Sequence, residues 1–170
     1  MRPQSGTYPV YFDNYIKLVD AISIEEAIEK YSDDLIKFFK KIRESNADYR
    51  YAPGKWSLKE LLQHIIDAER IFAYRALCIA RKDGTHLPGF DENSYAAESK
   101  ADSRTWKSLL KEFKSVRKST NNLIKSLNEE QLQQGGNTNG QPNTVVAISF
   151  VIFGHIIHHM NMVKERYLQE

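Results

Sequence analysis

Apolar residues recur at steps of three and four positions in four segments of this chain, and no segment of useful length alternates as a β-strand would. This spacing places the apolar side chains of each segment on one face of an α-helix. The predicted helices cover Ile24 to Glu44, Ser57 to Arg81, Ser103 to Leu127 and Thr144 to Leu168. Helices of roughly 20 residues in a chain of 170 predict an all-α fold, a four-helix bundle.

Polar residues at two helix starts and an apolar seam support these boundaries. Ser23 precedes Glu26 by three positions, and Ser57 precedes Glu60 by three, which is the spacing of a capping box. The third segment carries a seam typical of bundles, with apolar or small residues at alternating steps of three and four. Its members are Trp106, Leu109, Phe113, Val116, Thr120, Leu123 and Leu127.

Two long connections and an N-terminal arm complete the predicted domain. Residues 82–102 join the second helix to the third, and connections of this length are often functional. Residues 128–143, which are rich in Gly, Asn and Gln, join the third helix to the fourth. The arm, residues 1–22, holds too many apolar side chains for a free tail, so we expect it to pack on the bundle. Residues 1–170 are therefore expected to form a single domain.

Charge and composition indicate no special partner. The chain has 24 Lys and Arg against 22 Asp and Glu, spread along the sequence, so it lacks the basic stripe typical of nucleic-acid binding. Its longest apolar stretch, Val145 to Phe153, is interrupted by Ser149 and is far too short to span a bilayer. No signal pattern opens the chain, and the single Cys78 cannot form an internal disulfide. We expect a cytoplasmic protein with no nucleic-acid or membrane partner.

Three histidines are the candidate chemistry. His155 and His159 lie four positions apart on the inward face of the last predicted helix. Two neutral imidazoles there would need hydrogen-bond partners that an apolar face does not offer, whereas a metal ion satisfies one nitrogen of each. A third imidazole from His64, at the edge of the second helix's apolar face, would complete a typical catalytic zinc site with one open position. The spacing alone fits core histidines equally well.

Two other histidines are weaker candidates. His158 points about 60° away from His155 on the same helix, so we interpret it as a supporting or surface residue rather than a ligand. His86 lies in the first long connection and is most simply a solvated loop residue, to which we assign no role.

Three charged residues lie near His64 on the second predicted helix. Glu60 and Asp67 are four and three positions from it and would either orient its far nitrogen or only solvate the helix. We prefer solvation for Glu60 and keep the orienting role open for Asp67. Arg75 lies on nearly the same face three turns further along. It would either bind an anionic substrate group in a cleft or pair with a carboxylate, and we favour the carboxylate.

Several segments resemble a known family. They are Tyr51 to Glu60 (YAPGKWSLKE) leading to His64, Asp67 to Leu77 (DAERIFAYRAL), Leu87 to Asp91 (LPGFD), Asn139-Gly140, Gly154 to His159 and Glu165 to Tyr167. In these residues and in their order the chain resembles the DinB/YfiT-like superfamily, and the resemblance covers nearly its whole length.

The resemblance implies a fold, a metal site and an assembly. It implies a four-helix bundle with up-down-down-up connectivity and frequent homodimers. It also implies a divalent metal ion, zinc or nickel among others, bound by one histidine of the second helix and an HxxxH pair of the fourth. Those positions are His64, His155 and His159 in this chain. The donor set does not select the native metal, since imidazole suits zinc, nickel, copper and iron.

The leading hypothesis is a metal-dependent hydrolase or a low-molecular-weight-thiol S-transferase that acts on a small molecule. Three neutral imidazoles leave the metal ion its full positive charge, which lowers the pKa of a bound water or thiol. Neither reaction therefore needs a nucleophilic side chain from the protein. We assign no such nucleophile, and Cys78 is not one. The alternative is a stress-response protein that holds a metal or ligand without turnover. A fourth protein ligand would favour that alternative, and an open position beside a pocket would favour the enzyme. A nucleic-acid-binding regulator, suggested by the family's damage-inducible name, ranks last.

Overall fold

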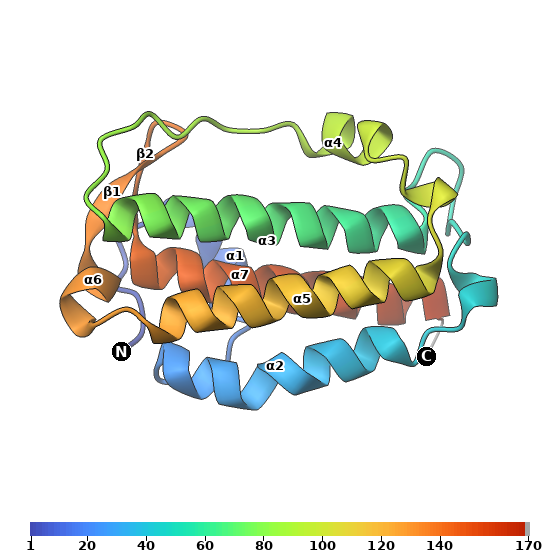
Figure 1. The fold of residues 1–170 in the computed structure, drawn as a ribbon, viewed down its shortest axis with the longest axis horizontal. Coiled ribbons are helices and arrows are strands. Elements are labelled where there is room, and N and C mark those ends of the chain that lie inside the picture. Colours follow the sequence, from blue (N-terminus) through green and yellow to red (C-terminus); the bar gives the residue numbers. More distant parts are fainter. Residues whose placement is uncertain (169–170) are drawn as a thin grey trace.

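The computed structural model describes residues 1–168, and four long helices in it form a bundle (Figure 1). These are α2 (Ile24–Lys40), α3 (Leu58–Ala80), α5 (Trp106–Lys125) and α7 (Val145–Met162), the last continued by a π-helical turn, Val163–Leu168. Helices α2 and α7 run in one direction and α3 and α5 in the other, which is up-down-down-up connectivity. Each of α3 and α2 packs against both α5 and α7, so the bundle predicted from the sequence is confirmed.

The long connection between α3 and α5 follows from this topology. Because these neighbouring helices are parallel, the chain must return along the full length of α3 before α5 begins, as Figure 1 shows. The returning segment, residues 81–105, is called the crossover segment below. It contains α4 (Glu92–Glu98) and the short 3-10 turn Ala101–Ser103. It forms one side of the cavity described below.

Helix starts agree well with the capping patterns, and helix ends agree less well. Ser57 and Glu60 form the expected capping box at α3, whereas Glu26 accepts from the backbone N–H of Ile22 rather than that of Ser23. Helix α2 ends at Lys40, four residues before the predicted end. The following 3-10 turn, Glu44–Asn46, brings the Glu44 carboxylate to the backbone N–H of Trp106 (2.8 Å), which draws the chain toward the start of α5.

Two short strands were not predicted. β1 (Gly135–Thr138) and β2 (Gln141–Thr144) form an antiparallel hairpin after the short helix α6 (Glu129–Gln133). Its turn residues, Asn139 (φ 53°) and Gly140 (φ 73°), have the positive φ values that favour Asn-Gly in two-residue hairpins. The strands lack an apolar alternation, so only the turn dipeptide signalled them.

The N-terminal arm packs along α7. It contains a 3-10 turn, Val10–Phe12, and helix α1 (Asp13–Ile16), and it buries Tyr8, Phe12, Ile16 and Val19, whereas Val10 and Tyr11 are exposed. Gly154 allows this close approach, because a Cβ atom there would lie 2.2 Å from the carbonyl oxygen of Tyr15. The arm is thereby held where Tyr15 can reach the histidines of α7.

Helix α7 is the core helix of the bundle. By length and composition alone, the segment Val145–Leu168 is long and apolar enough to cross a membrane. The apolar stretch noted in the sequence, Val145 to Phe153, is too short to do so. However, 78% of its most apolar window is buried inside the fold, which is typical of a helix surrounded by others. Its apolar character therefore has a sufficient explanation in packing.

The buried seam of α5 differs from the predicted one. Ile124 is buried in place of Leu123, and Val116 is only partly buried. Beside it lies Arg117, which is fully buried and pairs with Glu69 of α3 (2.9 Å). A charged residue in the seam was not expected, because apolar spacing does not reveal a buried ion pair.

Candidate metal centre

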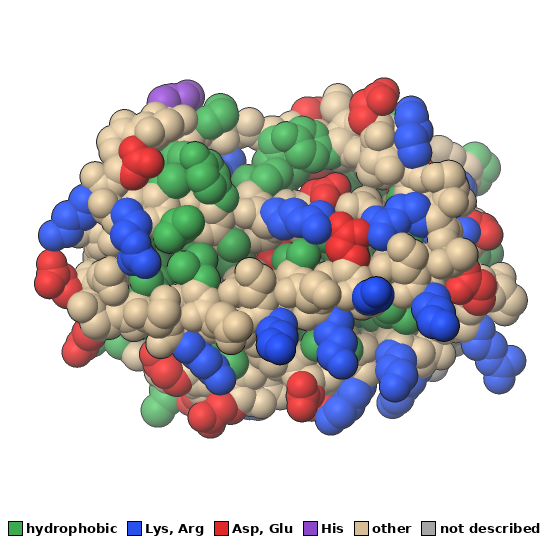
Figure 2. Space-filling model, viewed as in Figure 1, with side chains coloured by type: hydrophobic (Ala, Val, Ile, Leu, Met, Phe, Trp, Pro, Cys, Tyr) green, Lys and Arg blue, Asp and Glu red, His purple; other side chains and the backbone are tan. Residues whose placement is uncertain are grey.

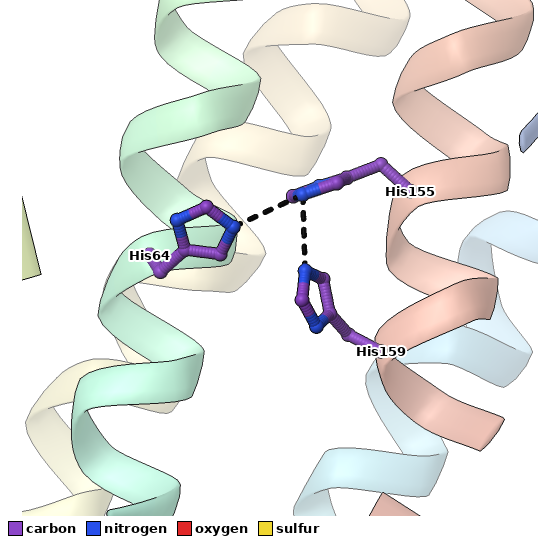
Figure 3. Close-up of side chains that lie close together, drawn as sticks. All are labelled: His64, His155 and His159. Carbon is purple, nitrogen blue, oxygen red and sulfur yellow. Dashed lines mark hydrogen bonds between the residues drawn. The ribbon is translucent and has the colours of Figure 1, made fainter. Parts of the chain in front are cut away.

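The three predicted histidines lie together between α3 and α7. His64 comes from the second turn of α3, and His155 and His159 lie one turn apart on α7, so that the packing of these helices brings the three rings together (Figure 3). The Nε2 atom of His155 is 3.1 Å from Nε2 of His64 and 3.0 Å from Nε2 of His159. All three side chains are buried, with at most 8% of their surface exposed.

Burial decides the protonation of these imidazoles. It lowers the pKa of His64 from 6.5 to about 4 and lowers the pKa of His155 and His159 well below the ordinary value. The neighbouring rings add to the effect for the pair on α7, because a second positive charge nearby is unfavourable. At neutral pH the three rings are neutral, which is the form that binds metals.

The donor geometry fits a divalent cation. A neutral imidazole Nε2 has either one N–H or one lone pair, so Nε2 of His155 cannot satisfy two other nitrogens by hydrogen bonding alone. A cation facing three lone pairs resolves this conflict. Two imidazoles on a tetrahedral zinc ion at about 2.0–2.1 Å have nitrogens roughly 3.3 Å apart, close to the distances found here. The ligand atoms of all three residues lie within 4.8 Å of one another.

Aromatic side chains fix the rings of the histidines. The indole of Trp56 lies 4.8 Å from the His64 ring, centroid to centroid, and the phenol of Tyr15 lies 5.6 Å from the His155 ring in an edge-on arrangement. Trp56 is itself held by its carbonyl, which accepts from the Tyr167 hydroxyl (2.8 Å). Nothing in the helical spacing connects these aromatics with the histidines, and only their contacts reveal that they surround the site.

A cavity of about 480 Å³ opens beside the histidines. Its walls come from α3, α7, the N-terminal arm, the crossover segment and the tip of the hairpin. The hairpin is tied to the crossover segment by the Asn139 N–H, which donates to the Leu87 carbonyl (2.8 Å). Aromatic and polar residues share the lining, which includes Tyr11, Phe12, Phe72, Arg75, Phe90, Glu92, Thr138, Asn139 and Gln141. A volume of this size suits a small organic ligand.

The remaining histidines lie outside the cluster. His158 is exposed, and its ring contacts Tyr15 (5.6 Å) and His159 (5.1 Å) from the outside. His86 is exposed in the crossover segment. Neither side chain lines the cavity, which agrees with the roles given to them from the sequence.

The charged residues near His64 have other partners. Glu60 caps α3 and pairs with Arg50, and Asp67 accepts from Gln63 Nε2 (2.9 Å), so both carboxylates have partners other than the His64 ring. The carboxylate partner favoured for Arg75 is wrong. Among residues 1–168 no carboxylate lies within ion-pair distance of Arg75, which instead lines the cavity. Helix geometry places residues on a face but does not reveal what the opposite element presents.

Basic side chains gather on the face of the molecule that α5 and α2 form (Figure 2). Figure 2 shows Lys and Arg side chains gathered over α5 and the end of α2, with few acidic side chains among them. The exposed lysines of α5 are Lys107, Lys111, Lys114, Lys118 and Lys125. The even mixture of charge along the sequence therefore does not extend to every face of the molecule, because helical spacing collects these lysines.

Fold and site together define a class: four-helix bundles with a buried three-histidine cluster open to a cavity. The chain belongs to the DinB superfamily, whose family description matches residues 27–163. Its fold is similar to that of YfiT from Bacillus subtilis, described as "a probable metal-dependent hydrolase with an unusual four-helix bundle topology". The two structures have a TM-score of 0.73 and 15% sequence identity, over 99% of this chain and 93% of that one. No curated protein matches the chain.

Proposed function

We propose that the protein is a metal-dependent hydrolase that acts on a small molecule through a divalent ion held by His64, His155 and His159. The observation that carries this proposal is the convergence of three neutral Nε2 atoms at the wall of a cavity of about 480 Å³. A divalent ion at this position supplies Lewis-acid chemistry that lowers the pKa of a water molecule or a thiol toward neutrality. Zinc and nickel both suit imidazole donors.

The surrounding residues keep the imidazoles neutral and orient them. Burial supplies the first effect, and the rings of Trp56 and Tyr15 supply the second. Within the described chain no serine or cysteine lines the cavity, and Cys78 is buried elsewhere in α3. A mechanism based on a side-chain thiol or serine nucleophile therefore has no candidate at this site.

Two other activities use the same site. Activation of a low-molecular-weight thiol would give S-transfer to an electrophile, as the family resemblance implies. A stress-response protein that only holds a metal would need no cavity beside the histidines, whereas one that holds a ligand without turnover would use the same cavity. Since the structure has such a cavity, and His64, His155 and His159 are the metal-ligand cluster found in residues 1–168, we place the enzyme first.

Metal content is the first test. Protein purified without an affinity tag is expected to contain about one divalent ion per chain, as a single three-histidine site requires. His155→Ala and His159→Ala are expected to abolish this content while far-ultraviolet circular dichroism stays helical. Absence of metal after reconstitution would refute the hydrolase and leave a ligand-binding role.

Activity is the second test. The metal-loaded protein is to be compared with the His64→Ala variant on aryl esters, and separately on a small thiol with an aryl halide. Metal-dependent ester cleavage would support the hydrolase, whereas activity only with the thiol would replace it by the transferase. Metal binding with neither activity would favour the non-catalytic protein.

The proposal also covers location and assembly. It places the protein in the cytoplasm as a homodimer that acts on a small molecule, in agreement with the sequence-based expectations. Size-exclusion chromatography with light scattering measures the assembly directly, and a monomeric mass would remove the dimer from the proposal.

A further inference from the structure

Arg75 is a buried cation on the wall of the histidine cavity. Its side chain extends from α3, three turns after His64, and only 7% of the residue's surface is exposed. One guanidinium nitrogen, Nη2, donates to the carbonyl of Pro88 in the crossover segment (2.5 Å), and the group lies 5.8 Å from the centre of the Phe72 ring. An arginine in this position remains charged, because its guanidinium does not lose its proton in proteins.

This charge lacks a counterion in the described part of the chain. Arg117 has Glu69, and Arg104 has Glu112, as buried or half-buried arginines usually have a carboxylate. Among residues 1–168 the Pro88 carbonyl is the hydrogen-bond acceptor of the Arg75 side chain. The other guanidinium nitrogens are not enclosed by protein, so they face open space.

The open space at Arg75 includes the histidine cavity. Arg75 and Tyr11 both line this cavity. Burial raises the pKa of the Tyr11 phenol, and the positive charge of Arg75 partly opposes that rise, as expected for two groups that lie close together. Arg75 also borders a smaller apolar cavity on the other side of the crossover segment. Glu92, at the rim of the histidine cavity, is exposed to solvent and is not within ion-pair distance of Arg75.

We propose that the cavity binds a small organic anion whose carboxylate or phosphate group pairs with Arg75 while its reactive group faces the three histidines. The inference rests on the proposed function and deepens it by naming the substrate class. Arg75 and His64 are eleven positions apart on one helix, on the order of 16 Å between Cα atoms, so the ligand is elongated. The aromatic wall between them, Phe12, Phe72 and Phe90, favours an apolar body.

The test measures binding in metal-free protein, so that neither the metal nor turnover contributes. Calorimetry compares 4-phenylbutyrate with its neutral amide, 4-phenylbutyramide, and with phenyl phosphate. The wild-type protein is expected to bind an anion about 10- to 100-fold more tightly than the amide, as for charge-assisted hydrogen bonds. The tighter of the two anions then identifies the carboxylate or the phosphate as the preferred group.

Matched substitutions on α3 and its C-cap separate the site from general charge effects. Arg75→Gln is expected to remove the preference for the anion, whereas Arg81→Gln, at an exposed position, is expected to keep it. Arg75→Lys restores the charge and is expected to recover part of the preference, which shows that the site still folds. Equal binding of acid and amide by the wild type, or an unchanged preference in Arg75→Gln, would overturn the proposal.

This experiment also separates the two proposals. A wild-type protein that binds metal and cleaves neutral esters but shows no preference for the anion would remove the substrate class and leave the hydrolase. In the active protein, Arg75→Gln is expected to raise KM about 10- to 100-fold for an ester with a terminal carboxylate. Its effect on KM for 4-nitrophenyl acetate, which has no anionic group, is expected to be much smaller, and equal effects on both esters would contradict the anion site.

Discussion

Replacement of Arg117 by methionine probes the buried ion pair between α5 and α3. Arg117 has no exposed surface, and its Nη1 lies 2.9 Å from Oε1 of Glu69, which is 2% exposed. The guanidinium also donates to Asn121 (2.8 Å) and lies 4.4 Å from the centre of the Phe153 ring on α7. The substitution keeps most of the apolar volume and leaves the Glu69 carboxylate without its cation.

The expected loss is large because the remaining carboxylate is desolvated. Breaking a buried pair costs about 3–5 kcal/mol, whereas replacing both members by apolar residues is often neutral or stabilising. At about 2–4 °C per kcal/mol for a chain of this size, Arg117→Met is expected to lower Tm by about 6–20 °C. The double variant Glu69→Leu, Arg117→Met is expected to lie within about 2 kcal/mol of the wild type.

The loss should depend on pH in a definite direction. Burial raises the pKa of Glu69 and Arg117 opposes that rise, so removing Arg117 raises the pKa further. A carboxyl whose pKa is higher in the folded than in the unfolded state stabilises the fold while protonated, and this stabilisation is lost as pH rises through the folded-state value. The destabilisation by Arg117→Met is therefore expected to be larger at about pH 8 than at about pH 5.

Urea unfolding of metal-free protein, followed by far-ultraviolet circular dichroism at both pH values, measures these differences. The histidine cluster is common to all four proteins of the cycle, so its own titration cancels. A loss below about 1 kcal/mol for Arg117→Met would refute the reasoning, since a buried pair costs more to break. A double variant as unstable as the sum of the single ones would show that the two residues do not act as a pair.

Three other perturbations test the site and the arm. Burial lowers the pKa of His64 from 6.5 to about 4. The folded metal-free protein therefore binds fewer protons than the unfolded chain in this pH range. In urea titrations the free energy of unfolding should fall by about 3 kcal/mol through this group as pH falls from 6.5 through about 4. A free energy of unfolding that does not change over this range would contradict the burial argument. Gly154→Ala places a Cβ atom 2.2 Å from the Tyr15 carbonyl and should cost about 1–3 kcal/mol in thermal unfolding, while Gly84→Ala, with no neighbour within 4 Å, should be nearly neutral. His158→Ala should leave the metal content unchanged in elemental analysis, because this side chain points away from the cluster; loss of metal would show that the ligand set is wrong.

Local pattern was sufficient for the helices and insufficient for their ends. The start of α3 follows from Ser57 and Glu60, whose side chains and backbone form a box within one turn. Helix α2 ends at Lys40, and beyond it Glu44 accepts a hydrogen bond from the backbone N–H of Trp106, a residue far away in the sequence that no local pattern connects with it. The hairpin was missed because its only local signal is the turn Asn139-Gly140.

The sequence by itself determined that the chain forms four long helices and that His155 and His159 share one face, because both properties follow from the helical repeat. Only the tertiary structure decided that His64 meets them, that Trp56 and Tyr15 enclose the rings, and that Arg75 has no carboxylate partner in the described chain. These relations join α3, α7, the arm and the crossover segment. The physical reason is that periodicity is a property of one segment, whereas burial and charge pairing depend on which segments pack together.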